Sequence, residues 1–242
     1  MWWRQIIRYW RSKSRMIGSL AQSFLFLVSL GLGLRTTFQM AGQGDYLAFI
    51  APGIMAQTIL SLAVFSGVEL IWDKEFGFLK ETLVAPVSRT EIILGRTLGG
   101  ATIATIQGVI VYFLTILFGF HTPLKLLFPA LVVMFLIALL YTAVGTFIAS
   151  LMRDFHGFQL IMNFFVMPTF FLSGAFFPLE NAPILIQAIA KINPLAWGII
   201  SLRYIFQASF FNPELTFAVA FLILTTTLFL FLATKAFEKI EA

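Results

Sequence analysis

The sequence predicts an all-α integral membrane protein with six transmembrane helices, an N-terminal amphipathic interfacial helix, and short re-entrant helices between spans 5 and 6. Two observations predict this class. Of 242 residues, 60% are hydrophobic and 11% charged, with a mean hydropathy of +0.94, whereas soluble domains carry about 25% charged residues. Six apolar runs are also long enough to cross a bilayer, which takes about 20 residues each. The whole chain, residues 1–242, is therefore expected to form a single transmembrane domain.

The first element is residues 1–15, which are expected to form the interfacial helix. At about 100° per residue, the tryptophans fall on one face and the arginines on another. A cleaved signal peptide is disfavoured, because the apolar run that follows is long and ends without a small-x-small site. Anchoring to lipid and docking of a partner both remain open for this helix. Its functional residues are Trp2, Trp3, Arg4, Arg8, Trp10, Arg11 and Arg15.

The six spans follow in order. They are expected at residues 16–34, 46–71, 92–118, 129–151, 158–177 and 215–234. Each run is apolar on all sides, which favours helices, since the strands of a membrane barrel alternate apolar and polar residues. Pro52 and Pro168 fall inside two of the runs and predict local kinks. Gly95, Gly99 and Gly100 give the third span a small-residue face that suits helix packing within the chain.

The distribution of Lys and Arg predicts which side of the membrane each loop faces. Most of the 16 basic residues lie on the side of the N-terminus, namely Arg4, Arg8, Arg11, Lys13, Arg15, Lys74, Lys80, Arg89, Arg96, Arg153, Lys235 and Lys239. Both termini and the loop of residues 72–91 are therefore expected to be cytoplasmic, in a multi-pass protein of the cytoplasmic (inner) membrane. Glu69, near the end of the second span, is expected to be solvated or paired with this loop.

The loop of residues 72–91 concentrates charge. The stretch DKEFGFLKETLV is expected to form one short helix that Pro86 ends. The next helix should begin at SRTE, with Ser88 or Thr90 as its N-cap and Glu91 in its first turn. This pattern predicts an ordered, charged surface that faces the cytosol.

No catalytic, nucleotide-binding or metal-binding motif accompanies these charges. The sequence has no G-x-x-x-x-G-K-[ST], G-x-S-x-G or H-E-x-x-H motif. Its two histidines, His121 and His156, are far apart, and it has no cysteine, so a metal site is not expected. This chain is therefore expected to bind no ATP by itself.

The segment between Pro178 and Pro213 contains two short apolar pieces, ILIQAIAKI and WGIISLRYIFQASF, interrupted by Asn193-Pro194. Each is too short to cross a bilayer, so re-entrant or interfacial helices on the outer face are expected. Arg203 is expected to snorkel to the outer headgroups or to pair with Glu180 or Glu214.

Two stretches of the chain resemble the permease subunits of ABC-2 type ATP-binding-cassette exporters, including their drug-export branch. EFGFLKETLVAPVSRTEIILGR is similar to the family's cytoplasmic loop between spans two and three. FFLSGAFFPLENAPILIQAIAKINPLAWGIISLR is similar to its outer segment after span five. Together these stretches cover about a quarter of the chain, and the order of the six spans and the basic amphipathic start extend the resemblance over its whole length.

The resemblance implies partners. It implies a cytosolic ABC ATPase subunit in two copies, acting with a second permease copy or homologue; ATP and magnesium would bind to the ATPase, and this chain would hold no cofactor. It implies an ATPase-coupling loop made of Lys74, Glu75, Phe76, Gly77, Phe78, Leu79, Lys80, Glu81, Leu83, Pro86 and Arg89. It also implies an outer lid made of Gly174, Phe177, Pro178, Pro183, Asn193, Pro194 and Arg203. Membrane lipids are further partners, and no nucleic acid is expected.

The predicted function is that of a non-enzymatic permease subunit of an ATP-driven exporter for an amphiphilic substrate, drug or lipid-like. An exporter of a polysaccharide or a lipid-linked glycan is the alternative within the family, although the N-terminus lacks an R-x-L-K-x-R-Y stretch. Alternatives of another class are a stand-alone channel and a membrane-embedded transferase. A transferase is disfavoured because the turn RDFHGF offers one Asp and one His, too few for metal-dependent chemistry.

Overall fold

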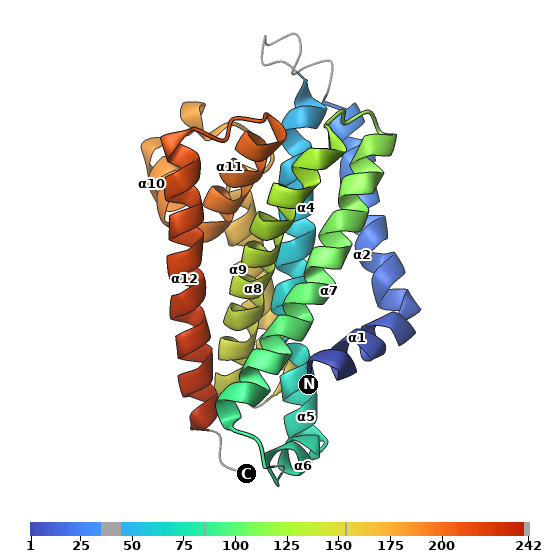
Figure 1. Cartoon of the computed structure of the whole chain (residues 1–242), viewed down its shortest axis with the longest axis vertical. Coiled ribbons are helices and arrows are strands. Elements are labelled where there is room, and N and C mark those ends of the chain that lie inside the picture. Colours follow the sequence, from blue (N-terminus) through green and yellow to red (C-terminus); the bar gives the residue numbers. More distant parts are fainter. Residues whose placement is uncertain (35–44, 85, 153, 240–242) are drawn as a thin grey trace.

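A computed structural model describes residues 1–34, 45–84, 86–152 and 154–239, apart from the side chains of Arg15, Leu32, Lys80, Leu83 and Asn181. Within these ranges the regular structure is entirely helical (Figure 1). The helices in the first half are α1 (Trp2–Arg11), α2 (Lys13–Phe26), a π-helical turn η1 (Leu27–Leu32), α4 (Tyr46–Phe65), α5 (Val68–Glu75), α6 (Phe78–Val84) and α7 (Arg89–Leu117). Those in the second half are η2 (Leu124–Leu126), α8 (Leu127–Leu151), α9 (Phe155–Phe171), η3 (Leu179–Asn181), α10 (Ile184–Ile192), α11 (Pro194–Phe206) and α12 (Pro213–Glu238).

Four helical stretches in the described part of the chain are long and apolar enough to cross a membrane: Tyr46–Glu75, Arg89–Leu117, Leu124–Leu151 and Pro213–Glu238. A fifth candidate is the pair α10 and α11, which is bent by 85°. The remaining predicted spans are shorter here. The first contains the apolar helix Met16–Gly31, and the fifth corresponds to α9, which ends at Phe171 after 17 residues. A multi-span helical fold is therefore confirmed, and the count of six remains a prediction.

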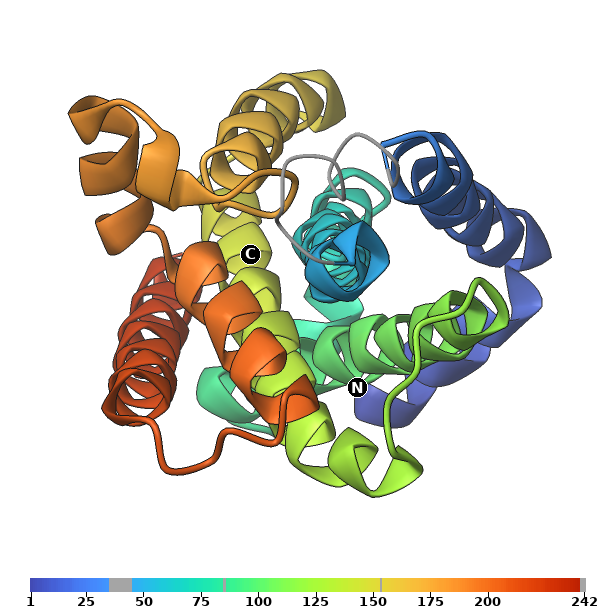
Figure 2. The same ribbon diagram turned by 90° about the horizontal axis from the view of Figure 1, so that it is seen from above.

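The bundle is built around α4, which is buried along most of its length. Seen from above, α2, α7, α8 and α9 surround α4, whereas α12 lies at the periphery beside α8 (Figure 2). Pro52 lies inside α4 and Pro168 inside α9, so neither proline ends its helix.

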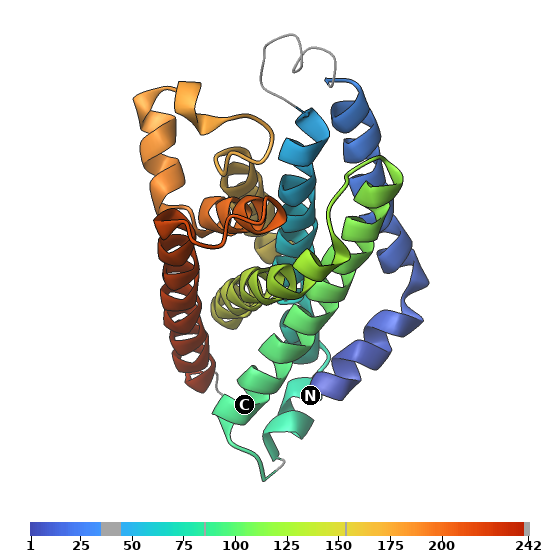
Figure 3. The ribbon, with the colours of Figure 1, turned by 45° about the horizontal axis from the view of Figure 1, so that its top comes forward.

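The N-terminus, α6 and the end of α12 lie at the same end of the bundle, and η3 and α10 lie toward the other (Figures 1 and 3). This arrangement agrees with the prediction that both termini and the loop of residues 72–91 share one side of the membrane. The assignment of that side to the cytoplasm rests on the basic residues.

The prediction of a single helix over DKEFGFLKETLV is wrong, because the chain forms two helices there. Helix α5 continues to Glu75, and α6 begins at Phe78. Between them Gly77 has a φ of +78°, a left-handed conformation that glycine adopts without steric cost and that commonly ends a helix. The helix start after Pro86 is as predicted, with Ser88 as the N-cap. The Glu91 amide donates to Ser88 Oγ at 3.2 Å, and the Ser88 amide donates to Glu91 Oε2 at 2.8 Å, which forms a capping box.

Candidate functional site

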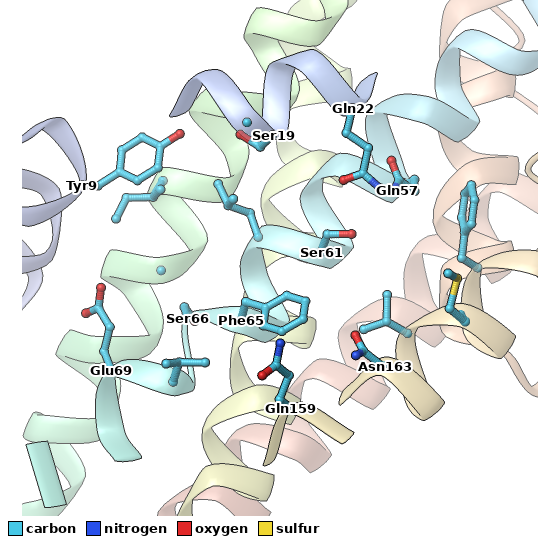
Figure 4. Close-up of a pocket in the computed structure, with 18 of the residues that line it drawn as sticks. Tyr9, Ser19, Gln22, Gln57, Ser61, Phe65, Ser66, Glu69, Gln159 and Asn163 are labelled. Carbon is cyan, nitrogen blue, oxygen red and sulfur yellow. The ribbon is translucent and has the colours of Figure 1, made fainter. Parts of the chain in front are cut away.

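A cavity of about 530 Å³ opens between the N-terminal helices and α9, with α4 and α5 behind it. Binding pockets for small molecules are commonly about 300–1,000 Å³. One part of its wall is polar and uncharged: Gln22, Gln57, Ser61, Gln159 and Asn163 point into the same space (Figure 4). Another part is apolar, with Phe26, Val166, Met167, Phe170 and Phe171. The cavity therefore offers separate surroundings for a polar and an apolar group.

Helix periodicity explains why these polar side chains converge. Gln57 and Ser61 are four residues apart on α4, and Gln159 and Asn163 are four residues apart on α9. Residues at that spacing lie on the same face of a helix, so each helix presents one polar pair. Within the described residues, these amides and hydroxyls make no side-chain hydrogen bond to the protein. Polar groups at membrane depth need partners, so this wall suits water or a hydrogen-bonding ligand.

A cluster of paired charges lies next to the cavity, with buried carboxylates on α5 and half-exposed arginines on α1. Arg4 Nη2 lies 2.9 Å from Asp73 Oδ2, and Arg8 Nη1 lies 3.6 Å from Glu69 Oε2. Arg96, from α7, also pairs with Asp73 Oδ2. Glu69 lines the cavity and is buried. The expectation that Glu69 is solvated or paired with the cytoplasmic loop is therefore wrong, because its carboxylate pairs with the N-terminal helix.

Helix α1 has three faces rather than the two that the sequence predicted. Trp2, Trp3 and Trp10 are exposed, as expected of a lipid-facing surface. Gln5 and Tyr9, on a face that the sequence analysis missed, are buried beside α7, where Tyr9 Oη donates to Gln107 Oε1 at 2.7 Å. On the basic side Arg4 and Arg8 reach the α5 carboxylates, whereas Arg11 is exposed; the side chain of Arg15 lies outside the described part. The four-residue spacing of Gln5 and Tyr9 was the available signal for the missed face.

The close packing of α1 against α7 depends on Gly99. A Cβ atom at this position would lie 2.3 Å from Gln5 Oε1 and 3.1 Å from Gln5 Cβ. A Cβ atom on the neighbouring Gly100 would meet Ser66 Oγ at 2.8 Å and Thr142 Cγ2 at 2.7 Å. The prediction that these glycines serve packing within the chain is confirmed.

The structure separates the predicted coupling residues into an inward and an outward group. Lys74 turns inward: its ammonium donates to the carbonyls of Ala149, Ser150 and Met152 at 2.8, 3.0 and 3.1 Å. Leu79 is buried, and Arg89 donates to the carbonyl of Glu238 at the end of α12.

The exposed part of this region is small and aromatic. Phe76 and Phe78 are 70% and 50% exposed, next to the turn at Gly77. The other exposed members of the predicted loop are Glu75, Gly77, Glu81 and Pro86, and the side chains of Lys80 and Leu83 lie outside the described part. Two exposed phenylalanines flanked by carboxylates form a surface that suits a protein partner. We call the surface made of Glu75, Phe76, Gly77, Phe78 and Glu81 the α5–α6 turn.

The outer segment is bent where the sequence predicted. Asn193 caps α11 by accepting from the Leu195 amide at 3.0 Å, and it donates to the Thr169 carbonyl of α9 at 2.7 Å. Pro194 is the first residue of α11, and the left-handed Gly174 follows α9. The other predicted lid residues, Phe177, Pro178 and Pro183, flank the turn η3.

Arg203 forms no ion pair with Glu180 or Glu214, so the expected pairing is wrong. Its guanidinium lies 3.7 Å from the centre of the Phe49 ring and donates to the Phe49 and Gly174 carbonyls, the latter at 2.9 Å. Arg203 thus ties the N-terminal part of α4 to the turn after α9. Glu214 instead accepts a hydrogen bond from Tyr204.

Several apolar helices of membrane length around a partly polar cavity define a multi-span membrane protein with a pocket of ligand size. The comparison with known proteins agrees: a model of the family described as "ABC-2 type transporter" matches residues 1–207. The chain belongs to this family of ABC transporter permeases. The family has a separate ATPase subunit as its partner, because such permeases lack an ATPase motif of their own.

Curated relatives match over most of the chain. Nodulation protein J of Rhizobium leguminosarum bv. trifolii is 28% identical over 205 residues, covering 83% of this chain and 78% of the relative. The putative transport permease ycf38 of Cyanophora paradoxa is 32% identical over 215 residues, covering 85% of this chain and 72% of the relative. The ycf38 protein of Porphyra purpurea is also 32% identical, over 221 residues, covering 86% and 73%.

Proposed function

We propose that this chain is the membrane subunit of an ATP-driven exporter and that the cavity holds an amphiphile with an uncharged, hydrogen-bonding head. The observation that supports this most is the set of neutral amide and hydroxyl groups that face one space and make no side-chain hydrogen bond to any residue the structure describes. Hydroxyl and amide groups of a ligand could donate to and accept from Gln57 and Gln159 alike. The tail would lie against Phe170 and its apolar neighbours.

The charge of the cavity favours a neutral head over a cationic drug. Glu69 is its one carboxylate among the described lining residues, and it is paired with Arg8. A cationic ligand would have to displace Arg8 or enter without a counter-ion, and an unpaired ion is costly in an apolar bundle. Of the substrate classes considered, a lipid-like molecule or a lipid-linked glycan therefore fits better than a cationic drug.

The proposal includes a second permease chain. Leu160, Phe164 and Met167 form an exposed apolar stripe on α9, beside the cavity. A copy or homologue packed there would cover the stripe and close the open side of the cavity. The transport path would then run between the two chains.

The energy would come from a cytosolic ATPase, in two copies, that docks on the α5–α6 turn. Phe76 and Phe78 would fill apolar pockets on that partner, and Glu75 and Glu81 would pair with basic residues around them. ATP and magnesium would be held by the ATPase. On this proposal α6, the N-terminus and the end of α12 would lie in the cytoplasm, in agreement with the basic residues at that end.

Alkylation of a single cysteine in lipid nanodiscs tests the proposed substrate class, because the native chain has no cysteine. Ser61→Cys would be treated with N-ethylmaleimide in the presence of three probes with the same tail: decyl maltoside, decyltrimethylammonium and decyl sulfate. Decyl maltoside should slow the reaction most. Ser209→Cys is the control, because this position is exposed between α11 and α12. It should react with N-ethylmaleimide at the same rate whichever of the three probes is present. Equal or greater protection by decyltrimethylammonium, or none by any probe, would contradict the proposed head chemistry.

A further inference from the structure

The basic residues of α1 and the acidic residues of α5 form a two-rung ion ladder. Arg4 pairs with Asp73 at 2.9 Å, and Arg8 pairs with Glu69 at 3.6 Å. The two arginines are one helical turn apart, and so are the two carboxylates. The earlier arginine pairs with the later carboxylate, so a shift of α1 by one turn would bring one arginine to the other carboxylate and leave the remaining carboxylate without its partner from α1.

Burial differs between the two sides of the ladder. The side chains of Asp73 and Glu69 are 2% and 7% exposed, whereas those of Arg4 and Arg8 are 41% and 40% exposed. A buried carboxylate without a cation is strongly destabilising, but a half-exposed arginine can be solvated. Because Asp73 also pairs with Arg96 of α7, it would keep one cation without α1, so the burial argument applies chiefly to the pair of Glu69 with Arg8.

The ladder lies between the α5–α6 turn and the cavity. Only Phe76 and Gly77 separate α5 from α6, so a displacement of α6 acts directly on the helix that carries Asp73. At the other end, Gln5 and Tyr9 of α1 line the cavity. Helix α1 thus contributes to the cavity wall while being held by charges to the helix that leads to the turn.

We infer that Arg4, Arg8, Glu69 and Asp73 are positioning residues. Their ion pairs hold α1 to α5, so that α1 and the α5–α6 turn move together. A partner that moves α6 would then also move the wall of the cavity formed by α1. The link itself follows from the ion pairs and their burial. Its use in transport rests on the proposed function, in which an ATPase supplies the movement.

Distance measurements between spin labels test the link without any ATPase. Labels would be attached at Trp10→Cys on α1 and Val84→Cys on α6, both exposed positions of the cysteine-free chain. The purified protein would be placed in nanodiscs and diluted with unlabelled protein, so that pairs within one chain dominate. The parent should give a single narrow distance distribution.

Glu69→Gln is the diagnostic variant, because it removes the buried charge and leaves Arg8 half-exposed rather than stranding a carboxylate. The narrow distribution should be lost in Glu69→Gln and retained in the control Arg11→Gln, which removes an exposed charge from the same helix. The exchange Arg8→Glu with Glu69→Arg should restore the narrow distribution. A Glu69→Gln distribution that superimposes on the parent's, or an exchange variant as broad as Glu69→Gln, would overturn the inference. Failure of an ATPase to bind would count against the proposed function alone.

Discussion

The ammonium of Lys74 donates to the main-chain carbonyl of Ala149 at 2.8 Å, so that α5 is tied to the C-terminal end of α8. The same ammonium reaches two further carbonyls of that helix end. A cation at a helix C-terminus satisfies carbonyls that have no partner within the helix and interacts favourably with the helix dipole. A residue that the sequence assigned to partner docking therefore has a structural role inside the bundle.

Lys74→Met should lower the free energy of unfolding by about 1–3 kcal/mol, because three carbonyls lose their donor at once. Unfolding in mixed micelles, followed by loss of tertiary signal, would measure the change. Lys125→Met removes an exposed lysine near the opposite end and should stay within about 0.5 kcal/mol of the parent. Equal effects of the two substitutions would contradict the assigned role.

Asp73→Asn should be more destabilising than Lys74→Met. It would leave the buried guanidinium of Arg96 without a carboxylate, and breaking a buried pair on one side costs about 3–5 kcal/mol. The double variant Asp73→Asn with Arg96→Met also removes the buried cation, so it should regain part of the lost free energy of unfolding. The same unfolding assay, arranged as a double-mutant cycle, measures the coupling; additive losses would show that the two side chains do not interact as described.

Gly99→Leu should release α1 from α7, because even a Cβ atom there overlaps the side chain of Gln5. The expected result is faster tryptic cleavage at the arginines of α1. Gly18→Leu is the matched control, since no atom lies within 4 Å of a Cβ atom built at that position. Cleavage of Gly99→Leu at the parental rate would contradict the close packing of α1 on α7.

Gln57→Leu should weaken binding of decyl maltoside without lowering stability, because its amide faces the cavity and bonds to no described protein group. Loss of one hydrogen bond to a ligand is worth about 0.5–1.5 kcal/mol, or about twofold to tenfold in affinity. Protection of Ser61→Cys against alkylation would give the affinity, and unfolding would give the stability. If affinity is unchanged in both Gln57→Leu and Gln159→Leu, the polar wall is not the site of the head group.

Local sequence patterns predicted the helices well. Four of the apolar runs, the helix start at Ser88 and the Asn193-Pro194 break each depend on neighbours within a few residues, and the structure places them close to where the sequence did. The first and fifth runs form shorter helices. The helix break at Gly77 was missed because a single glycine within a helical pattern is compatible with either a helix or a turn.

The partners of the buried charges could not be predicted in the same way. Glu69 pairs with Arg8, and Arg203 contacts Phe49, 154 positions away. Such contacts depend on how helices cross, which apolar periodicity does not specify. The polar wall had a local signal, the four-residue spacing of Gln57 and Ser61, but its convergence with α9 required the fold.

Isolation of the protein with its partner tests the central claim most directly. The tagged chain, extracted from membranes of the cells that make it, should co-purify with a polypeptide that hydrolyses ATP. Phe211→Ser, which removes a fully exposed phenylalanine between α11 and α12, should retain this activity, whereas Phe76→Ser combined with Phe78→Ser should lose it. If no ATPase activity accompanies the parent, or if it accompanies all three proteins equally, then coupling to an ATPase through the α5–α6 turn is contradicted.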